Sequence, residues 1–336
     1  MHFRLKAFGV FLAVAIMTAL GFHASPASAT QGGPSAAPPR IATHAGSAKA
    51  GVHSPKGKPV DQGTRSSKVS LLLTGPYYAY NEGHQNLTAP ATAGGIQAGF
   101  NVGDPTIASG AYHSLAEAAA TKTINGQPNI VEIGWIKSTA VCGGTGGPCL
   151  FAFWWKNGVG TCYNGCGWVD YAGNSMNLGA ALTPGTTYTF GIQWDAASTA
   201  WWLYSNTGTG TTSNWLGYFD DTLWTANNAY GAPVTGFTSV DRVQVFGEVA
   251  EDDDFGTGLA CTDMGNGRQG SSYTAPWAYA SDPVYISSAT LVAPSAGLTT
   301  SLTSNNVPAL YTGYSTLWPG TPPSTRTFYF GGPADC

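Results

Sequence analysis

The feature that most constrains the fold is a series of short apolar runs, rich in Val, Ile, Thr and aromatic residues, that turn residues separate. Runs of this kind, bounded by Gly, Pro, Asn and Asp, are typical of β-strands. We expect strands at residues 95–102, 129–137, 150–156, 167–172, 187–194, 200–206, 215–219, 240–249, 273–279 and 325–330. Only residues 114–121 (SLAEAAAT) have a helical pattern. Many short strands without alternating helices predict an all-β fold of antiparallel sheets, packed as a sandwich or jelly roll.

The composition changes at Val69. Every tryptophan and nearly all the other aromatic residues follow it, whereas residues 30–68 consist mainly of Ala, Ser, Gly, Pro and Thr. A segment of that composition buries too little apolar surface to offset the entropy lost on ordering. We therefore expect a disordered or extended arm at residues 30–68 and a single catalytic domain at residues 69–336.

Residues 1–29 have the order of a secretory signal. A short basic region comes first, an apolar run from Ala7 to about Phe22 follows, and Ala27-Ser28-Ala29 supplies the small-x-small cleavage pattern. An uncleaved anchor is the alternative, but the run is short for a membrane span. No later stretch reaches about 18 consecutive apolar residues. The sequence therefore predicts a secreted, extracellular protein with no membrane partner.

Charge divides the chain at the same place. Residues 30–68 carry six cations and only Asp61 as an acid, whereas six cations face seventeen acidic residues after Val69. An acidic domain argues against nucleic acid as a partner, because binding to phosphate needs basic surface. The basic arm fits either a cleavable pro-segment that covers the active surface or a cell-wall spacer, and the sequence leaves both open.

Six cysteines in an exported chain favour disulfides. Clustered cysteines can also bind zinc, but no pair here has the usual partner spacing. We therefore expect no metal. Several connectivities are possible, so the pairing is a hypothesis. The expected pairs are Cys142–Cys149, Cys162–Cys166 and Cys261–Cys336.

The sequence lacks the residues that most hydrolase mechanisms require. The expected domain contains only two histidines, His84 and His113, and neither belongs to a His-Glu-x-x-His zinc motif. A Gly-x-Ser-x-Gly elbow is absent, as are the common glycine-rich phosphate-binding motifs. Carboxylates are what remains for acid–base chemistry, and we expect no cofactor.

The expected domain has five glutamates. We expect Glu82 in a polar turn and Glu117 in the helical segment, both solvated. Glu251 opens an acidic run that we interpret as a solvated loop, with a calcium site as the alternative. Glu132 and Glu248 lie inside expected strands, where a charged residue is disfavoured unless it faces solvent or a cleft.

Because side chains in a strand alternate between the two faces of the sheet, the sequence shows which residues share a face with each of these two glutamates. Glu132 shares its face with Gly134, and Glu248 shares its face with Gln244. Gly134 and Gly247 leave room beside them for another backbone to approach. A solvent-facing role is nevertheless the commoner one for a strand glutamate, so position alone does not decide their function.

Several motifs together resemble the neprosin family of glutamic endopeptidases. The strand Glu132-Ile133-Gly134-Trp135 is similar to the family's Glu-x-Gly-Trp, and Gly247-Glu248-Val249 is similar to its second glutamate segment. The resemblance covers roughly residues 94–333, with the motifs in the family's order. The supporting matches are Phe100-Asn101-Val102 with Pro105, Cys162-Tyr163-Asn164, Trp201-Trp202, Gly217-Tyr218, Met264-Gly265-Asn266-Gly267-Arg268 and Tyr329-Phe330-Gly331-Gly332-Pro333.

The resemblance implies a secreted peptidase that acts in acid with Glu132 and Glu248 as its catalytic pair, without assigning which is the base. Two facing carboxylates share a proton, so one can activate a water while the other donates. Trp135 and Gln244 are candidates for lining the site, with packing on the sheet face as the alternative. The resemblance also implies cleavage on the carboxyl side of proline. The expected partner is a peptide or protein substrate, and we expect a monomer.

Two rival functions use other features of the sequence. A glycoside hydrolase also employs two glutamates on a jelly roll, and surface tryptophans suit sugar stacking. A non-catalytic carbohydrate- or wall-binding module needs neither glutamate. Neither rival explains the ordered neprosin-like motifs, since a fold alone does not specify function.

Overall fold

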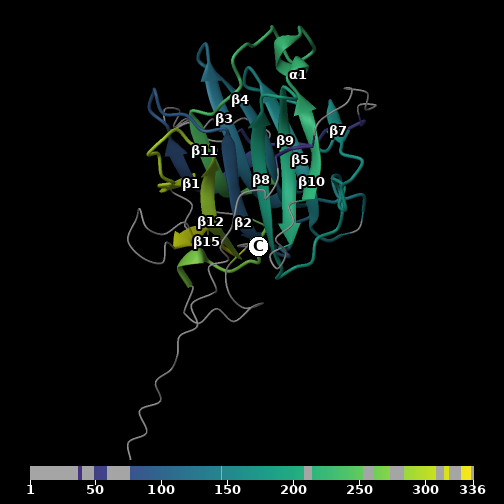
Figure 1. Cartoon of the computed structure of the whole chain (residues 1–336). Helices are drawn as coiled ribbons and strands as arrows, with labels where there is room; N and C mark the ends of the chain where they lie inside the picture. Colours follow the sequence, from purple (N-terminus) through teal and green to yellow (C-terminus); the bar gives the residue numbers. More distant parts are fainter. Residues whose placement is uncertain are drawn as a thin grey trace, which may run out of the picture.

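Two antiparallel β-sheets face each other and contain most of the regular structure (Figure 1). The structure is a computed structural model that describes residues 37–39, 49–58, 76–144, 146–207, 214–252, 261–272, 284–307, 314–317 and 327–333. One short helix, α1 (Thr222–Thr225), lies at the end of the sandwich. Within the described ranges, no helix is long and apolar enough to cross a membrane.

The first sheet has seven strands and places the long strands β11, β3 and β4 at its centre. Long central strands pair on both edges, so the side chains on their two faces are held firmly in position. In spatial order the strands are β13 (Thr303–Val307), β1 (Tyr77–Asn86), β11 (Arg242–Glu251), β3 (His113–Ile124), β4 (Gln127–Lys137), β5 (Cys149–Lys156) and β6 (Val159–Gly160).

The second sheet has eight strands and covers one face of the first. Among the described residues, a 3-10 turn, η2 (Gly270–Ser272), follows the loop at 261–269. In spatial order the strands are β14 (Ser315–Leu317), β15 (Phe328–Gly331), β12 (Val284–Val292), β2 (Gly95–Asn101), β8 (Thr187–Asp195), β9 (Ala200–Thr207), β10 (Asn214–Asp220) and β7 (Trp168–Asp170).

The main core fills the space between the sheets, and β4 shows how the sequence builds it. Val131, Ile133 and Trp135 point into this core, whereas Ile130 and Ile136 belong to a separate apolar cluster on the outer face of the seven-stranded sheet. The alternation follows from the two-residue period of a strand. Because both faces are apolar, this sheet is covered on both sides. The all-β sandwich that the sequence predicts is confirmed.

The helical expectation for residues 114–121 is wrong, because this segment lies within strand β3. Ala116, Ala118 and Ala120 point into the core between the sheets. β3 pairs with β11 along one edge and with β4 along the other. Alanine favours helix when a segment stands alone, but two full hydrogen-bonded edges outweigh a preference of a few tenths of a kcal/mol per residue.

Most of the other expected strands are present within a few residues of their predicted ends. The expected strand at 273–279 lies outside the described residues, and the one at 325–330 corresponds to β15 in its described part. The sequence did not predict β1 or β12. Both contain small or polar residues, such as the Asn-Glu-Gly-His of β1, that weaken the strand signal.

Two of the three predicted disulfides are confirmed. Cys142 pairs with Cys149, and Cys162 pairs with Cys166. Cys261 is disulfide-bonded as well, but its expected partner Cys336 lies outside the described residues.

Candidate active site

Three glutamates from three adjacent strands meet on the outer face of the seven-stranded sheet. Glu132 comes from β4, Glu248 from β11, and Glu117 from β3, which lies between those two strands. Each of the three side chains is fully buried. Burying several carboxyl groups together is unfavourable unless they are paired or protonated, so such a cluster marks a candidate functional site.

The fourth charged member of the cluster is Lys56, which comes from the basic arm. Its Nζ donates to Glu117 Oε1 at 2.7 Å and to Glu248 Oε2 at 2.9 Å, and it lies 3.6 Å from Glu132 Oε2. The Lys56 side chain is 2% exposed. A single ammonium group therefore touches all three carboxyl groups, and these must open onto one shared space.

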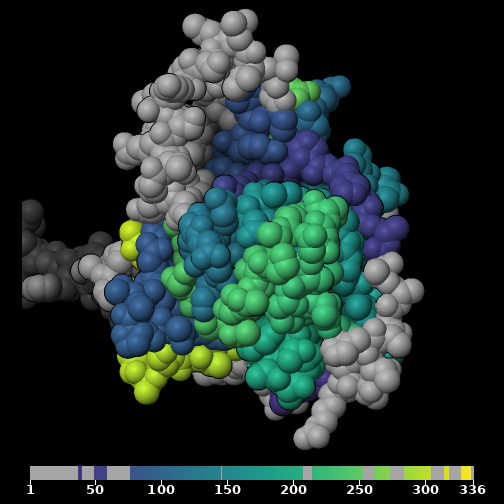
Figure 2. Space-filling view, turned by 90° about the horizontal axis from the view of Figure 1, so that it is seen from above, coloured from purple at the N-terminus to yellow at the C-terminus, as the bar shows by residue number. Residues whose placement is uncertain are grey.

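Backbone contacts fix the arm in this position. Val52 and Tyr163 exchange two backbone hydrogen bonds of 2.9 Å each, and the Tyr163 hydroxyl donates to Pro55 O at 3.2 Å. The Gly57 amide donates to Glu248 Oε1 at 2.9 Å. Figure 2 shows residues 49–58 in purple, lying across the surface of the domain. The described part of the arm thus covers the glutamate cluster.

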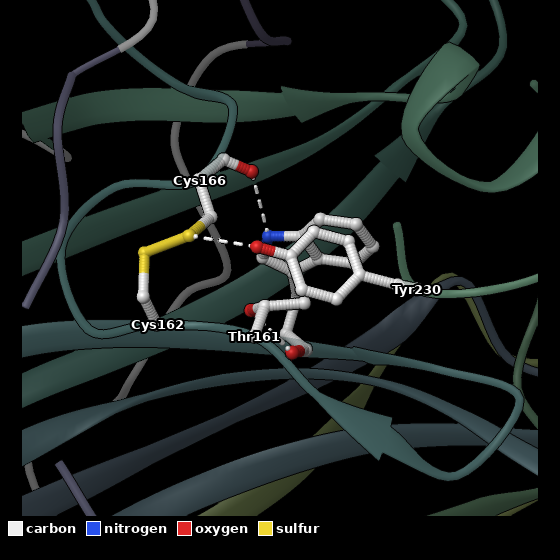
Figure 3. The surroundings of a disulfide bond; sticks show 5 residues. Thr161, Cys162, Cys166 and Tyr230 are labelled. Carbon is white, nitrogen blue, oxygen red and sulfur yellow. Dashed lines mark hydrogen bonds between the residues drawn. A yellow bond between two sulfur atoms is a disulfide. The ribbon is translucent and has the colours of Figure 1, made fainter. Parts of the chain in front are cut away.

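The Cys162–Cys166 hairpin carries Tyr163, the residue to which the arm is hydrogen-bonded. The Tyr230 hydroxyl lies 3.1 Å from Cys166 Sγ, and a tryptophan indole N–H from β5 donates to the carbonyl oxygen of Cys166 at 3.0 Å (Figure 3). Inside the hairpin, the Tyr163 ring packs edge-on against Phe153. The disulfide therefore holds in place the residue that receives the arm.

Glu132 and Glu248 each have one further polar partner. Trp155 Nε1 donates to Glu132 Oε1 at 3.0 Å, and His113 Nε2 lies 2.9 Å from Glu248 Oε1. One atom of each of Glu117, Glu132 and His113 (Oε2, Oε2 and Nδ1) is buried without a hydrogen-bond partner among the described residues. Unpaired buried acceptors are costly, so the cluster is built to bind further hydrogen-bonding groups.

Burial acts to raise the pKa of each of the three carboxyl groups. Neighbouring charges and hydrogen bonds differ between the groups, however, so their net pKa shifts differ. For Glu132, burial and the Glu248 charge outweigh Lys56 and raise the pKa from 4.5 to about 7. Burial and the charge of Glu132 hold the pKa of Glu117 well above its usual range. For Glu248, Lys56 and His113 outweigh burial, so its pKa falls below its ordinary value. An ionised Glu248 therefore lies beside two carboxyls that retain protons.

Two glycines make the close approach in the cluster possible. A Cβ on Gly57 would lie 1.8 Å from the Tyr80 hydroxyl oxygen. Gly134 is directly opposite Glu117 in the β3–β4 register, and a Cβ there would lie 2.7 Å from Glu117 Cβ. The glycine in the Glu132-Ile133-Gly134 segment is therefore required because Glu117 fills the space beside it.

Replacing Gly134 with alanine should destabilise the domain and displace Glu117. The added Cβ would lie 2.0 Å from the carbonyl oxygen of Ala116 in a strand that is paired on both edges. Overpacking of this kind costs about 1–3 kcal/mol, measured as the free energy of unfolding in urea. Gly147→Ala is the matched control, because a Cβ there meets nothing within 4 Å. Equal stability of the two variants would contradict the close packing described here.

Replacing Trp155 with phenylalanine should raise the pKa of Glu132 further, because the indole hydrogen bond lowers it. Leaving Glu132 Oε1 without a donor should also cost about 1–3 kcal/mol of unfolding free energy. The pKa can be followed by carbon NMR of labelled glutamate. Trp154→Phe is the control, since its indole N–H donates to Cys166 O rather than to a carboxyl group. A similar shift in both variants would show that the hydrogen bond does not act on Glu132.

Three of the glutamate expectations are corrected by the structure. Glu82 lies in strand β1, where it accepts from Arg242 at 2.8 Å. Glu251 is the last residue of β11, is 1% exposed and accepts from the backbone amide of Cys261 at 3.2 Å. Glu117 is fully buried rather than solvated. The common cause is that segments expected to be turn, loop or helix are parts of central strands.

The two candidates for lining the site differ in position. Trp135 points into the core between the sheets, where its indole N–H donates to Asn101 O at 3.1 Å. It does not line the cluster, because Trp135 and Glu132 are three residues apart in the strand and therefore point to opposite faces of the sheet. Gln244 lies on the same strand as Glu248, but its amide donates to Glu82 Oε1 at 2.7 Å. The structure therefore places Gln244 beside a different buried carboxyl group.

Four residues of the cluster were not expected from sequence: Lys56, His113, Glu117 and Trp155. Three of them lie on strands, and the two-residue period would have placed Glu117 and His113 on one face had β3 been predicted as a strand. Lys56 carries no such signal, because residues 30–68 show no periodicity.

One group of potential metal ligands combines His53 of the arm with the two cysteines of the hairpin. Ligand atoms of His53, Cys162 and Cys166 all lie within 4.8 Å of one another. The two sulfurs form a disulfide, however, and it is the thiolate that binds a metal. These residues are therefore not suited to hold a metal ion.

The sequence model of the family described as Neprosin matches residues 110–333. No curated protein matches the chain. A solved structure of scytalido-glutamic peptidase with a peptide-based transition state analog is similar over 77% of this chain and 100% of that chain, at 11% identity and a TM-score of 0.41, as is one with a transition state analog inhibitor. A native glycosidic hydrolase covers 54% of this chain and 81% of its own, at 10% identity and a TM-score of 0.19. Structural likenesses this weak carry no argument about function.

Proposed function

The chain belongs to the neprosin family, and from that premise we propose that it is a glutamic endopeptidase whose catalytic pair is Glu132 and Glu248. One observation carries the proposal: carboxyl groups from two non-adjacent strands open onto the space that a single ammonium group fills. A water and a peptide carbonyl that entered this space would meet an ionised and a protonated carboxyl at the same time.

The opposite pKa shifts assign a role to each glutamate in this proposal. Glu248, with its lowered pKa, acts as the base and takes a proton from water as the water oxygen bonds to the carbonyl carbon. Glu132, with its raised pKa, donates to the developing oxyanion and then gives its proton to the leaving amine as the C–N bond breaks. The proton on Glu248 returns to Glu132, so the cycle closes with one water consumed.

This assignment leads to acid-favoured activity. Glu132 must keep its proton, and burial raises its pKa to about 7 in the arm-bound form, so it retains the proton in acid. Glu248 must be ionised, which its lowered pKa favours in moderate acid. Departure of the arm removes both Lys56, which lowers the pKa of the two groups, and part of the burial, which raises it, so the two effects oppose each other.

For residues 30–68 we favour the pro-segment over the cell-wall spacer. The support is the position of Lys56, whose ammonium group fills the space between the carboxyl groups and so excludes water and substrate from it. A spacer needs no buried lysine. The basic arm on the acidic domain then acts as an internal inhibitor that is removed or displaced for activity.

Secretion and proline specificity complete the proposal. Export rests on the signal pattern of residues 1–29 and agrees with the disulfides, which form in oxidising compartments. Cleavage after proline rests on family membership. Both are checked on the exported protein, by N-terminal sequencing and by reading the ends of the fragments it makes.

The function is tested by offering the enzyme two substrates across about pH 3 to 7. An unstructured, proline-rich protein and a soluble polysaccharide are incubated separately with the full-length chain that carries Lys56→Met, a substitution that removes the ammonium group from the site. We expect peptides from the first, most rapidly in acid, and no new reducing ends from the second. Release of reducing ends without peptides would replace this proposal with a glycoside hydrolase.

A further inference from the structure

Lys56 Nζ marks a point from which a bound atom can reach two carboxyl groups at once. That point lies 2.7 Å from Glu117 Oε1 and 2.9 Å from Glu248 Oε2, which are hydrogen-bonding distances. Glu132 Oε2 is 3.6 Å away. The group with the shortest contact to this point is therefore Glu117, which is outside the catalytic pair of the proposed function.

The surrounding strands hold Glu117 in place as firmly as they hold Glu132 and Glu248. It lies on the strand between the two that carry Glu132 and Glu248, opposite a glycine whose missing side chain gives it room. It is fully buried, and its Oε2 has no hydrogen-bond partner among the described residues. Packing alone does not require a carboxyl group here, because an apolar side chain of similar size would fill the space without leaving a buried oxygen unpaired.

We propose that Glu117 is a third catalytic residue, a protonated carboxyl that donates a hydrogen bond to the oxyanion of the peptide carbonyl. This inference rests on the proposed peptidase function and deepens it. When the arm leaves, the space of Lys56 Nζ takes the attacking water on the side of Glu248 and the carbonyl oxygen on the side of Glu117, within hydrogen-bonding distance of Glu117 Oε1. At that distance an ionised Glu117 would set two acceptors against each other, whereas its protonated form supplies the missing donor.

The electrostatics of the cluster agree with this role. Burial favours the neutral form of Glu117, and the negative charge of the ionised Glu248 adds to this effect. A neutral carboxyl in a dry site can donate to an oxyanion without the reorganisation that water would need. Glu117 transfers no proton in this scheme: it stabilises charge, Glu248 takes the proton of water, and Glu132 protonates the amine.

Two substitutions of similar size distinguish a role of Glu117 as hydrogen-bond donor from a role in filling space. Glu117→Gln keeps an N–H donor in the same place, and Glu117→Met fills similar volume with no donor. Both are measured in full-length chains that also carry Lys56→Met, so that the ion pair of the arm with Glu117 does not differ between variants; the chain with Lys56→Met alone is the wild-type reference. Glu132→Gln and Glu248→Gln are measured in the same way, for kcat and KM on one peptide substrate at about pH 4. Near-ultraviolet circular dichroism and the melting temperature establish that each variant is folded.

We expect Glu117→Met to lose about 10²–10³-fold in kcat with little change in KM, because a donor to the oxyanion acts in the transition state. Glu117→Gln should stay within about tenfold of wild type at acid pH. It should also lose less of its activity than wild type as the pH rises, since its donor cannot ionise.

Each alternative result has one meaning. If folded Glu117→Met is as active as Glu117→Gln, the residue only fills space and the inference is overturned. If Glu117→Gln is as inactive as Glu117→Met, a hydrogen-bond donor is not what the site needs there, and the inference is also overturned. If Glu132→Gln and Glu248→Gln keep full activity, the proposed function itself fails, whatever Glu117 does.

Discussion

Replacing Lys56 with methionine should give a full-length chain that cleaves peptides near neutral pH, where the wild-type chain with its arm in place is blocked. The substitution removes two short charged hydrogen bonds and one further ion pair from the arm. A hydrogen bond to a charged group contributes about 1.5–3 kcal/mol, so the fraction of chains with an open site should rise at least about tenfold. The initial rate of peptide cleavage before any arm is removed measures this fraction.

Lys58→Met is the matched control for this experiment. Lys58 carries the same charge only two residues further along the arm, but its side chain is exposed. Its substitution should leave the block in place. An equal rise in initial rate for both variants would show that the overall charge of the arm, and not the contact at the cluster, keeps the site closed.

Acid should weaken the same block in the wild-type chain. Glu248 has a lowered pKa in the folded, arm-bound form, so it stabilises that form above its ordinary pKa. This stabilisation is lost as the pH falls through the lowered value, where Glu248 takes up a proton and its ion pair with Lys56 ends. Glu132 and Glu117, with raised pKa values, are already protonated there and hold Lys56 less firmly.

Substituting either member of the catalytic pair with glutamine should lower kcat/KM by about 10²–10⁴-fold, the range for a lost general acid or base. Glutamine has the shape of glutamate but neither takes nor gives a proton at these pH values. The fold should survive in both. Glutamine is neutral like the protonated Glu132 that it replaces, whereas Glu248→Gln loses the ion pair with Lys56 and should lower the melting temperature more. The rate on a peptide substrate and the melting temperature are measured together.

Glu82→Gln provides the comparison for this pair. Glu82 is buried on the same sheet and accepts from Arg242 and Gln244, and within the described part of the chain it makes no hydrogen bond or ion pair to Lys56. Its substitution leaves Arg242 less well paired, so the melting temperature should fall while the folded enzyme keeps its activity. Loss of activity in all three variants alike would indicate a general effect of buried substitutions rather than a catalytic pair.

Much of the fold could be predicted from the sequence because apolar and β-branched residues alternate clearly in strands such as β4 and β8. Glu132 and Glu248 stood out for the same reason, as charged residues within strands. The short spacing of Cys142 with Cys149 and of Cys162 with Cys166 also indicated the correct disulfides.

The rest depended on tertiary contacts that have no local signal. The alanines of β3 favour helix in isolation, and pairing with β11 and β4 reverses that preference. Missing this strand concealed Glu117. The contribution of Lys56 was hidden for a different reason: one buried side chain in a polar arm follows no pattern, and only its contact with three carboxyl groups reveals it.

The most direct test of the catalytic pair is digestion of an unstructured, proline-rich protein at about pH 4 by the Lys56→Met chain, whose arm does not block the site, with the pair wild type or with Glu132→Gln or Glu248→Gln. Mass spectrometry of the products gives both the amount of cleavage and the residue at each new end. We expect fragments from the chain with the wild-type pair, with proline at the new carboxyl ends, and almost none from either folded variant. Fragments produced equally well by both variants would contradict the assignment of Glu132 and Glu248 as the catalytic pair.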